Sequence, residues 1–258
     1  MRARDYPYFS PRFIAAAHRG GSGLPANRGI ENSARAFANA AALGYRHFET
    51  DVHATLDGTL VAFHDATLDR VTDGHGTIGH LPWAQVRRAR IGGREPIPTL
   101  DELLETFPHA RFNIDIKARA AIVPLWETIL RHDAFDRVCV ASFSGSRLSA
   151  FRRLSGTRVA TAVGPLGVSW TAYGVGIRSI RAPRGQAYQI PERYLGERVP
   201  VLSRGLINAA HAAGQLVHVW TIDDPDDMAR LIALGVDGLV SDRIDVLKDV
   251  LVTHGLWD

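Results

Sequence analysis

The sequence predicts an α/β fold from three observations. Short apolar runs bounded by turn residues occur eight times along the 258 residues. Most of these runs precede a segment whose apolar residues have helical spacing. The chain is 46% hydrophobic and 22% charged, which is typical of a globular protein with a sizeable core. We therefore expect a (β/α)8 TIM barrel that forms a single domain over residues 1–258, because barrels of this length are commonly one unit.

The predicted barrel strands are short runs rich in aliphatic, aromatic and β-branched residues. Alternation of such strands with helices indicates a parallel sheet, and eight repeats fit a closed barrel better than a doubly wound sheet. The strands are expected at residues 12–18, 46–52, 111–117, 137–143, 158–163, 187–191, 216–222 and 238–242.

Two of the predicted helices have clear start and stop signals. The helix after the first strand can be capped by Asn32 or Ser33 and ended by Gly44. After the seventh strand, Asp224 can cap a helix whose first position is Pro225. These segments are typical of strand–helix units.

Residues 53–110 interrupt the alternation of strands and helices. This stretch contains a hairpin, the glycine-rich segment TDGHGTIGHLP and the helical segment IPTLDELLETFP. An insertion of this length after a strand commonly covers a site. We therefore expect a small cap between the second and third barrel strands.

The composition argues against several classes of protein. The formal net charge is +3 and no run of five basic residues occurs, so neither a nucleic-acid partner nor a membrane-binding stripe is expected. The one cysteine, Cys139, excludes a disulfide scaffold. The sequence contains no signal peptide and no apolar span of ~20 residues, so we expect a cytoplasmic protein without a stable membrane anchor.

Three acidic residues are predicted to point into the barrel. Side chains alternate along a strand, so Glu49 and Asp51 share the inward face of the second strand. The same alternation turns Asp115 and Lys117 inward on the third barrel strand. Three carboxylates in one small volume raise one another's pKa values, and a bound cation removes this cost. An all-oxygen ligand set favours one divalent cation, Mg²⁺ or Ca²⁺, over zinc.

Two histidines are predicted to flank these acids. His18 ends the first strand, which neighbours the second strand in a barrel. The Asp57-Gly58 dipeptide predicts a two-residue hairpin turn, and the resulting register sets Asp51 opposite His64. Two imidazoles beside a metal site can act as a paired general acid and general base.

Fixed positive charge completes the predicted site. Arg19 follows His18, and Lys117 lies on an inward strand face, where both suit a phosphate group. Of the 30 basic residues only Lys117 and Lys248 are lysine, which leaves 28 arginines. A lysine kept at an inward position indicates that a compact ammonium is required there. These features predict a small-molecule phosphodiester as substrate.

Other polar residues have simpler predicted roles. We expect His47 and His218 to face the interior as hydrogen-bonded core residues, and His53 to lie on the surface. Asp242 is expected either at the rim of the pocket or as a helix cap, and we favour the cap. Glu31 is expected either to start a helix or to support a residue of the site.

The sequence resembles the glycerophosphodiester phosphodiesterase family in five segments that occur in order between residues 16 and 247. They are HRGG, ENSARAFANAAALGYRHFETDVHATLDGTLVAFHDATLDRVTDGHG, NIDIK, ASF and VWTIDDPDDMARLIALGVDGLVSD. The resemblance implies a metal-dependent barrel enzyme that hydrolyses glycerophosphodiesters to an alcohol and glycerol 3-phosphate. By position, the implied roles are general acid/base for His18 and His64, metal binding for Glu49, Asp51 and Asp115, phosphate contact for Arg19 and Lys117, and pocket lining for Phe143 and Trp220.

Two departures from the family pattern leave alternatives open. The family usually has Glu at the position of Asp115, and Asp there resembles the related sphingomyelinase D-type phospholipases, which release a cyclic phosphate. The segment SGLPANRGI is also longer than usual. The alternatives are a phospholipase D-like lyase of the sphingomyelinase D or lysophospholipase D type, and a catalytically silent barrel that binds phosphoesters. The sequence does not specify the head group, the physiological ion or the oligomeric state.

Overall fold

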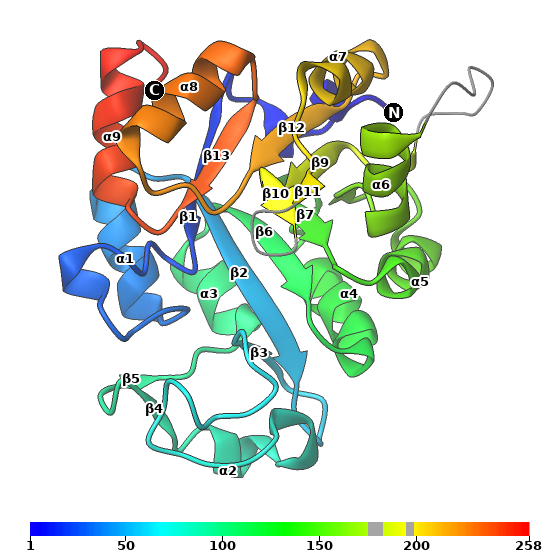
Figure 1. Cartoon of the computed structure of the whole chain (residues 1–258). Coiled ribbons are helices and arrows are strands. Elements are labelled where there is room, and N and C mark those ends of the chain that lie inside the picture. Colours follow the sequence, from blue (N-terminus) through cyan, green and yellow to red (C-terminus); the bar gives the residue numbers. More distant parts are fainter. Residues whose placement is uncertain (175–182, 195–198, 258) are drawn as a thin grey trace.

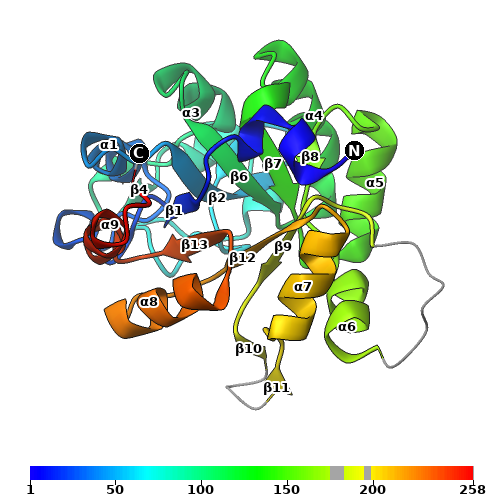
Figure 2. The same cartoon turned by 90° about the horizontal axis from the view of Figure 1, so that it is seen from above.

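Eight parallel strands form the centre of the computed structural model, which describes residues 1–174, 183–194 and 199–257. Along the sheet they follow the order β8, β7, β6, β2, β1, β13, β12 and β9. A parallel bridge between Ala162 and Ala187 joins the two ends of this order, so the predicted barrel is confirmed and nearly closed (Figure 1 and Figure 2). The strands are β1 (Ile14–His18), β2 (His47–Ala54), β6 (Arg111–Ile116), β7 (Val138–Ala141), β8 (Ala160–Thr161), β9 (Ala187–Ile190), β12 (Leu216–Val219) and β13 (Gly238–Ser241).

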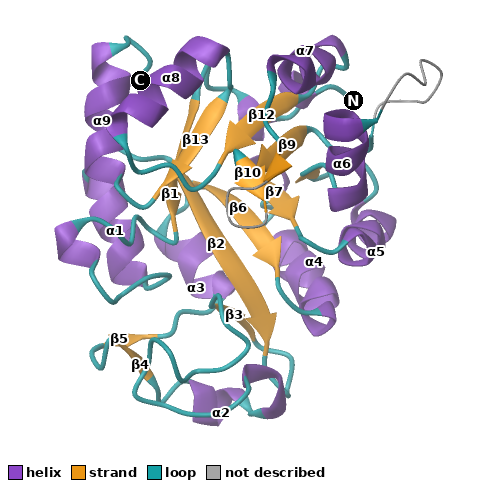
Figure 3. Ribbon diagram, in the orientation of Figure 1, coloured by secondary structure: helices purple, strands orange, loops and turns teal. Residues whose placement is uncertain are grey.

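Helices cover the outside of these strands (Figure 3). The predicted caps are present: Ser33 accepts a hydrogen bond from the N–H of Ala36, and Asp224 accepts from the N–H groups of Asp226 and Asp227. None of the helices in the described ranges is long and apolar enough to cross a membrane. The helices of the barrel are α1 (Ala34–Ala42), α3 (Leu100–Thr106), α4 (Ile122–Arg131), α5 (Gly145–Ser155), α6 (Pro165–Tyr173), α7 (Arg204–Ala212), α8 (Pro225–Leu234) and α9 (Ile244–Thr253).

The chain between β2 and α3 forms a layer beyond the carboxyl end of β2, in the lower part of Figure 1. It contains β3 (Leu60–Ala62), α2 (Trp83–Val86), β4 (Arg90–Ile91) and β5 (Glu95–Pro96). The layer has its own apolar cluster, which includes Val61, Phe63 and Ile78. The layer therefore brings a separate buried core to the end of the barrel where β2 finishes. A further pair of short strands, β10 (Arg193–Tyr194) and β11 (Val199–Pro200), follows β9.

The hairpin of β2 and β3 has a different register from the predicted one. The N–H of Phe63 donates to the carbonyl of Asp51 at 2.9 Å, so Phe63 and not His64 lies opposite Asp51. The loop contains three residues rather than two, because the N–H of Gly58 donates to the carbonyl of Thr55 at 3.0 Å and Gly58 adopts a φ of +87°. A turn followed by a left-handed glycine is the usual three-residue alternative to the two-residue turn.

The alternation predicted for β2 and β6 is present. Phe48 and Phe112, whose ring centroids are 5.5 Å apart, are fully buried in the apolar cluster that the helices complete. In register with them, Asp51 lies beside Asp115 on the adjacent strand, and Glu49 lies beside Asn113. The register thus gathers polar side chains of both strands into one part of the interior.

The amino-terminal segment closes the other end of the barrel. The ring of Tyr8 packs edge-on against His47, and the ring of Phe9 lies 5.9 Å from that of His218. His47 Nε2 lies 3.1 Å from the carbonyl oxygen of Tyr8, which fits the expected hydrogen-bonded core histidine. The expectation is wrong for His218, because its buried Nε2 has no hydrogen-bond partner in the described part of the chain.

Candidate active site

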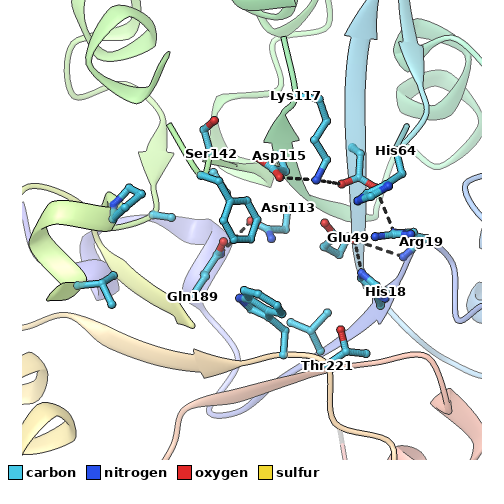
Figure 4. A pocket seen from close by; sticks show the side chains of 18 of the residues that line it. His18, Arg19, Glu49, His64, Asn113, Asp115, Lys117, Ser142, Gln189 and Thr221 are labelled. Atoms are coloured by element: carbon cyan, nitrogen blue, oxygen red, sulfur yellow. Dashed lines mark hydrogen bonds and ion pairs between the residues drawn. The ribbon is translucent and has the colours of Figure 1, made fainter. Parts of the chain in front are cut away.

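A pocket opens at the carboxyl ends of the barrel strands (Figure 4). One side is polar and the other is apolar, because different strands contribute to each. All the residues expected at the site from the sequence line this pocket: His18, Arg19, Glu49, Asp51, His64, Asp115, Lys117, Phe143 and Trp220.

Three buried carboxylates form the polar side. Glu49 is 8% exposed, Asp51 1% and Asp115 5%. Burial is the largest cause of the raised pKa of Glu49, which is about 7, and the charge of Asp51 is the next largest. Burial also raises the pKa of Asp115. Burial opposes ionisation of Asp51 as well, but Lys117 and Arg19 outweigh it and lower the pKa of Asp51.

Lys117 lies between two of these carboxylates. Its Nζ is 2.8 Å from Asp51 Oδ1 and 2.7 Å from Asp115 Oδ2 (Figure 4). Burial alone would lower the pKa of this ammonium, but the two aspartates outweigh burial and raise it. Lys117 is therefore held as a cation by the acidic cluster, at the edge of the space expected to receive a phosphate.

The donor set fits a hard divalent cation without presenting a finished cage. In the ranges that the structure describes, no three histidine, cysteine or carboxylate side chains are grouped so that they could hold a metal ion as they stand. However, Asp115 Oδ1 is buried and has no hydrogen-bond partner among the described residues. A buried oxygen without a partner, in the same pocket as the Glu49 carboxyl whose pKa is raised to about 7, indicates that further positive charge can be accommodated here. Glu49, Asp51 and Asp115 are the residues that could hold such a cation.

His18 is oriented by an acid that the sequence interpretation assigned elsewhere. Its Nδ1 lies 2.9 Å from Asp242 Oδ1, and its Nε2 lies 3.8 Å from Glu49 Oε2. Burial alone would lower the pKa of His18, but the hydrogen bond to Asp242 and the charge of Glu49 raise it. The expectation that Asp242 caps a helix is wrong, because α9 begins after Arg243 without a side-chain cap. The available signal was its position after the last strand, which neighbours the first strand in a closed barrel.

His64 reaches the pocket by a route other than the predicted hairpin register. Its Nδ1 lies 2.6 Å from Asp65 Oδ1, and its side chain is 34% exposed. The backbone carbonyl of His64 lies 3.1 Å from Nε2 of His53, which is on β2. His53 is buried rather than on the surface as expected, and burial lowers its pKa. A neutral ring can donate from Nε2 and hold the backbone of His64 beside the strand.

Arg19 contacts two acids and adopts an uncommon backbone conformation. Its φ is +50°, and its N–H donates to the carbonyl of Glu49 at 3.0 Å. Its Nη1 lies 3.1 Å from Glu31 Oε1, which confirms the expectation that Glu31 supports a residue of the site. Its Nε lies 3.3 Å from Asp51 Oδ2, as an ion pair without hydrogen-bond alignment. Strain of this kind is common at functional sites.

The opposite side of the pocket is apolar. Phe143 and Trp220 make an edge-to-face contact with ring centroids 5.5 Å apart, and Phe143 is 56% exposed. Val163, Pro165 and Val168 extend this wall onto α6. Such a wall suits the non-polar part of a substrate.

Two amides, Asn113 and Gln189, line the pocket but were not among the site residues predicted from the sequence. Gln189 Nε2 donates to Asn113 Oδ1 at 2.8 Å, across the interior from β9 to β6 (Figure 4). The inward positions of β6 already implied that Asn113 faces the axis, but Gln189 has no charge or motif to mark it. Amides with free groups toward a pocket can bind hydroxyl groups of a ligand.

Solved structures of similar fold support the barrel assignment. A putative glycerophosphoryl diester phosphodiesterase from Silicibacter pomeroyi has a TM-score of 0.79 at 21% identity, over 98% of this chain and 100% of that chain. A phosphodiesterase from Oleispira antarctica, solved in complex with the product sn-glycerol-3-phosphate, has a TM-score of 0.78 at 24% identity. That match covers 93% of this chain and 96% of that chain. At these identities the likeness establishes the fold.

Sequence comparison identifies the family. The model of the glycerophosphoryl diester phosphodiesterase family matches residues 18–246. A probable glycerophosphodiester phosphodiesterase from Mycobacterium tuberculosis is 43% identical over 250 residues, which covers 95% of this chain and 93% of the relative. The matched residues include both histidines and all three acids of the pocket. The chain therefore belongs to the glycerophosphoryl diester phosphodiesterase family of enzymes.

Proposed function

We propose that this chain hydrolyses glycerophosphodiesters to an alcohol and glycerol 3-phosphate, with His18 and His64 as general acid and base and with one divalent cation, Mg²⁺ or Ca²⁺. One observation carries the proposal. Two histidines line the same pocket as three buried carboxylates, and each histidine is hydrogen-bonded through Nδ1 to a different aspartate. Such pairs of oriented imidazoles suit proton transfer at both ends of a phosphodiester.

The histidine partners set which nitrogen can react. When Nδ1–H donates to a carboxylate, the neutral ring has a bare Nε2, and Asp242 and Asp65 both contact Nδ1. One Nε2 then takes a proton from the attacking hydroxyl or water, and the other histidine, protonated, donates to the oxygen of the leaving alcohol. The same arrangement serves either direct hydrolysis or attack by the glycerol hydroxyl followed by opening of a cyclic phosphate.

The remaining residues bind and orient the phosphodiester. Arg19 presents a guanidinium that Glu31 and Asp51 hold in place, and such a group suits phosphate oxygens. Lys117 supplies a second positive charge at the carboxylate cluster. A cation held by Glu49, Asp51 and Asp115 would polarise the phosphoryl group when bound.

Several broader properties belong to the same proposal. We propose that residues 1–258 act as one catalytic unit, with a small-molecule phosphodiester as substrate and no nucleic-acid partner. The near-neutral composition supports the absence of a nucleic-acid partner, and the single cysteine supports a cytoplasmic location. The comparisons do not favour the lyase or the silent binding barrel.

Phosphorus NMR of product formation from glycerophosphocholine tests the proposal. With Mg²⁺ or Ca²⁺ we expect a glycerol 3-phosphate signal, and with chelator we expect none. His18→Ala and His64→Ala are each expected to lose roughly 10²- to 10⁴-fold in rate, the usual contribution of general acid–base catalysis. His80→Ala is the matched control, because His80 is an exposed histidine outside the pocket. Full activity in His64→Ala, or a persistent cyclic product from the wild type, would contradict the proposed mechanism.

A further inference from the structure

A chain of ion pairs outside the pocket connects His64 to Arg19. His64 Nδ1 lies 2.6 Å from Asp65 Oδ1, and Arg70 Nε lies 2.5 Å from Asp65 Oδ2. Arg70 Nη2 lies 2.7 Å from Glu31 Oε1, which lies 3.1 Å from Arg19 Nη1. The chain therefore joins a proposed acid/base residue to a proposed phosphate contact through one arginine.

Arg70 contacts both carboxylates with two nitrogens each. Its Nη2 also lies 3.1 Å from Asp65 Oδ1, and its Nη1 lies 3.2 Å from Glu31 Oε2. The two acids come from different parts of the chain, since Glu31 follows β1 and Asp65 follows β3. Only a planar guanidinium has enough fixed donors to bind two carboxylates in this way.

The position of Arg70 separates it from the reacting groups. It does not line the pocket, and its side chain is 48% exposed. Both of its partners, in contrast, contact residues that do line the pocket. The hydrogen bonds from Arg70 are the first cause that lowers the pKa of Asp65 to about 2, so Asp65 is held ionised beside His64.

We propose that Arg70 is a positioning residue. By binding Asp65 and Glu31 together, it fixes the imidazole of His64 and the guanidinium of Arg19 relative to each other. The inference rests on the proposed roles of His64 and Arg19. Without Arg70, both carboxylates can rotate, and the layer that carries His64 loses its tie to the loop after β1 at this point. A displacement of about 1 Å in a reacting group can cost roughly 10²-fold in rate.

Arg94 offers a matched control. It is an exposed arginine of the same layer, and its Nη2 donates to the carbonyl of Arg28 at 3.1 Å, in the same loop after β1. Within residues 1–174, 183–194 and 199–257, Arg94 is not among the residues that line the pocket. Arg94→Ala therefore removes a tie between the layer and the loop without touching Asp65 or Glu31.

Steady-state kinetics with glycerophosphocholine compare the variants. We expect Arg70→Ala to lower kcat/KM roughly 10- to 100-fold, as loss of supporting groups commonly does. Both kcat and KM should change, because His64 and Arg19 are both affected. Millimolar guanidinium should restore part of the rate of Arg70→Ala and none of that of His64→Ala. Arg70→Lys should recover little, because an ammonium cannot form the double fork, and Arg94→Ala should remain within about twofold of wild type.

Histidine-¹⁵N NMR of the protein without substrate gives a readout that is independent of turnover. The ring signals of His64, assigned with His64→Gln, should shift in Arg70→Ala and stay in place in Arg94→Ala. If Arg94→Ala loses as much activity as Arg70→Ala, or if the His64 signals are the same in both variants, the inference is wrong. If the wild type does not hydrolyse the substrate but the His64 signals still respond to Arg70 alone, the proposed function fails and the positioning role stands.

Discussion

Replacing Lys117 with Met should destabilise the protein strongly, and a divalent cation should counteract the loss. Lys117 Nζ contacts Asp51 and Asp115 at 2.8 and 2.7 Å, and the side chains of these aspartates are only 2% and 6% exposed. Removing one partner of a buried ion pair costs about 3–5 kcal/mol, because the remaining charge is left uncompensated. For a chain of this size, each kcal/mol changes Tm by roughly 2–4 °C, so the expected decrease is roughly 6–20 °C in chelator.

Thermal and urea unfolding of the two proteins, in chelator and in millimolar Mg²⁺ or Ca²⁺, measure the effect. The cation should stabilise Lys117→Met more than the wild type, because Asp51 and Asp115 then bind it without competition from the ammonium. Lys248→Met is the matched control, since Lys248 Nζ donates to the carbonyl of Leu43 and lies 5.5 Å from the centroid of the Trp257 ring, away from the acidic cluster. A loss below about 1 kcal/mol in chelator would show that the aspartates are not paired as described. An equal response of variant and wild type to the cation would contradict the metal-site reasoning.

Three further predictions follow from the same geometry. Asp242→Asn removes the hydrogen-bonded charge that raises the pKa of His18, so the limb of the pH profile of kcat/KM that reports His18 should move to lower pH. A profile that does not move would refute the pairing of His18 with Asp242. The pKa of Glu49 is raised from 4.5 to about 7 in the folded protein, so in chelator its contribution to the free energy of unfolding is complete below pH 4.5 and is lost as the pH rises through about 7. Urea unfolding should therefore show lower stability at pH 8 than at pH 5, and Mg²⁺ should reduce the difference. Phe143→Ala and Trp220→Ala should raise KM more than they lower kcat, and the reverse pattern would indicate a role in the chemical step instead of binding.

Local patterns were sufficient to predict most of the barrel. The helices that follow the first and seventh strands begin at side-chain caps, which are hydrogen bonds between residues close in sequence. The structure contains both predicted caps, Ser33 and Asp224. The inward direction of Asp51 and Asp115 follows from alternation along each strand, which a single strand determines without its neighbours.

The hairpin shows where a local pattern can mislead. Asp57-Gly58 is compatible with a two-residue or a three-residue loop, and the choice moves the partner of Asp51 by one position. The register is decided by which side chains the layer between β2 and α3 buries, and Phe63 belongs to that buried cluster. His64 still lines the pocket because His53 and Asp65 hold it there.

Spacing and residue type were enough to predict the order of the strands along the chain, the inward acids and the nine residues expected at the pocket. The partners of these residues depend on contacts that form only when the chain has folded. Asp242 is 224 residues from His18 in the sequence, and the two meet because parallel pairing of β1 with β13 closes the barrel. Glu31 and Arg70, 39 residues apart, meet because the layer after β2 folds back over the loop after β1. Contacts of this kind arise from barrel closure and packing between separate segments, and no local pattern of residues encodes them.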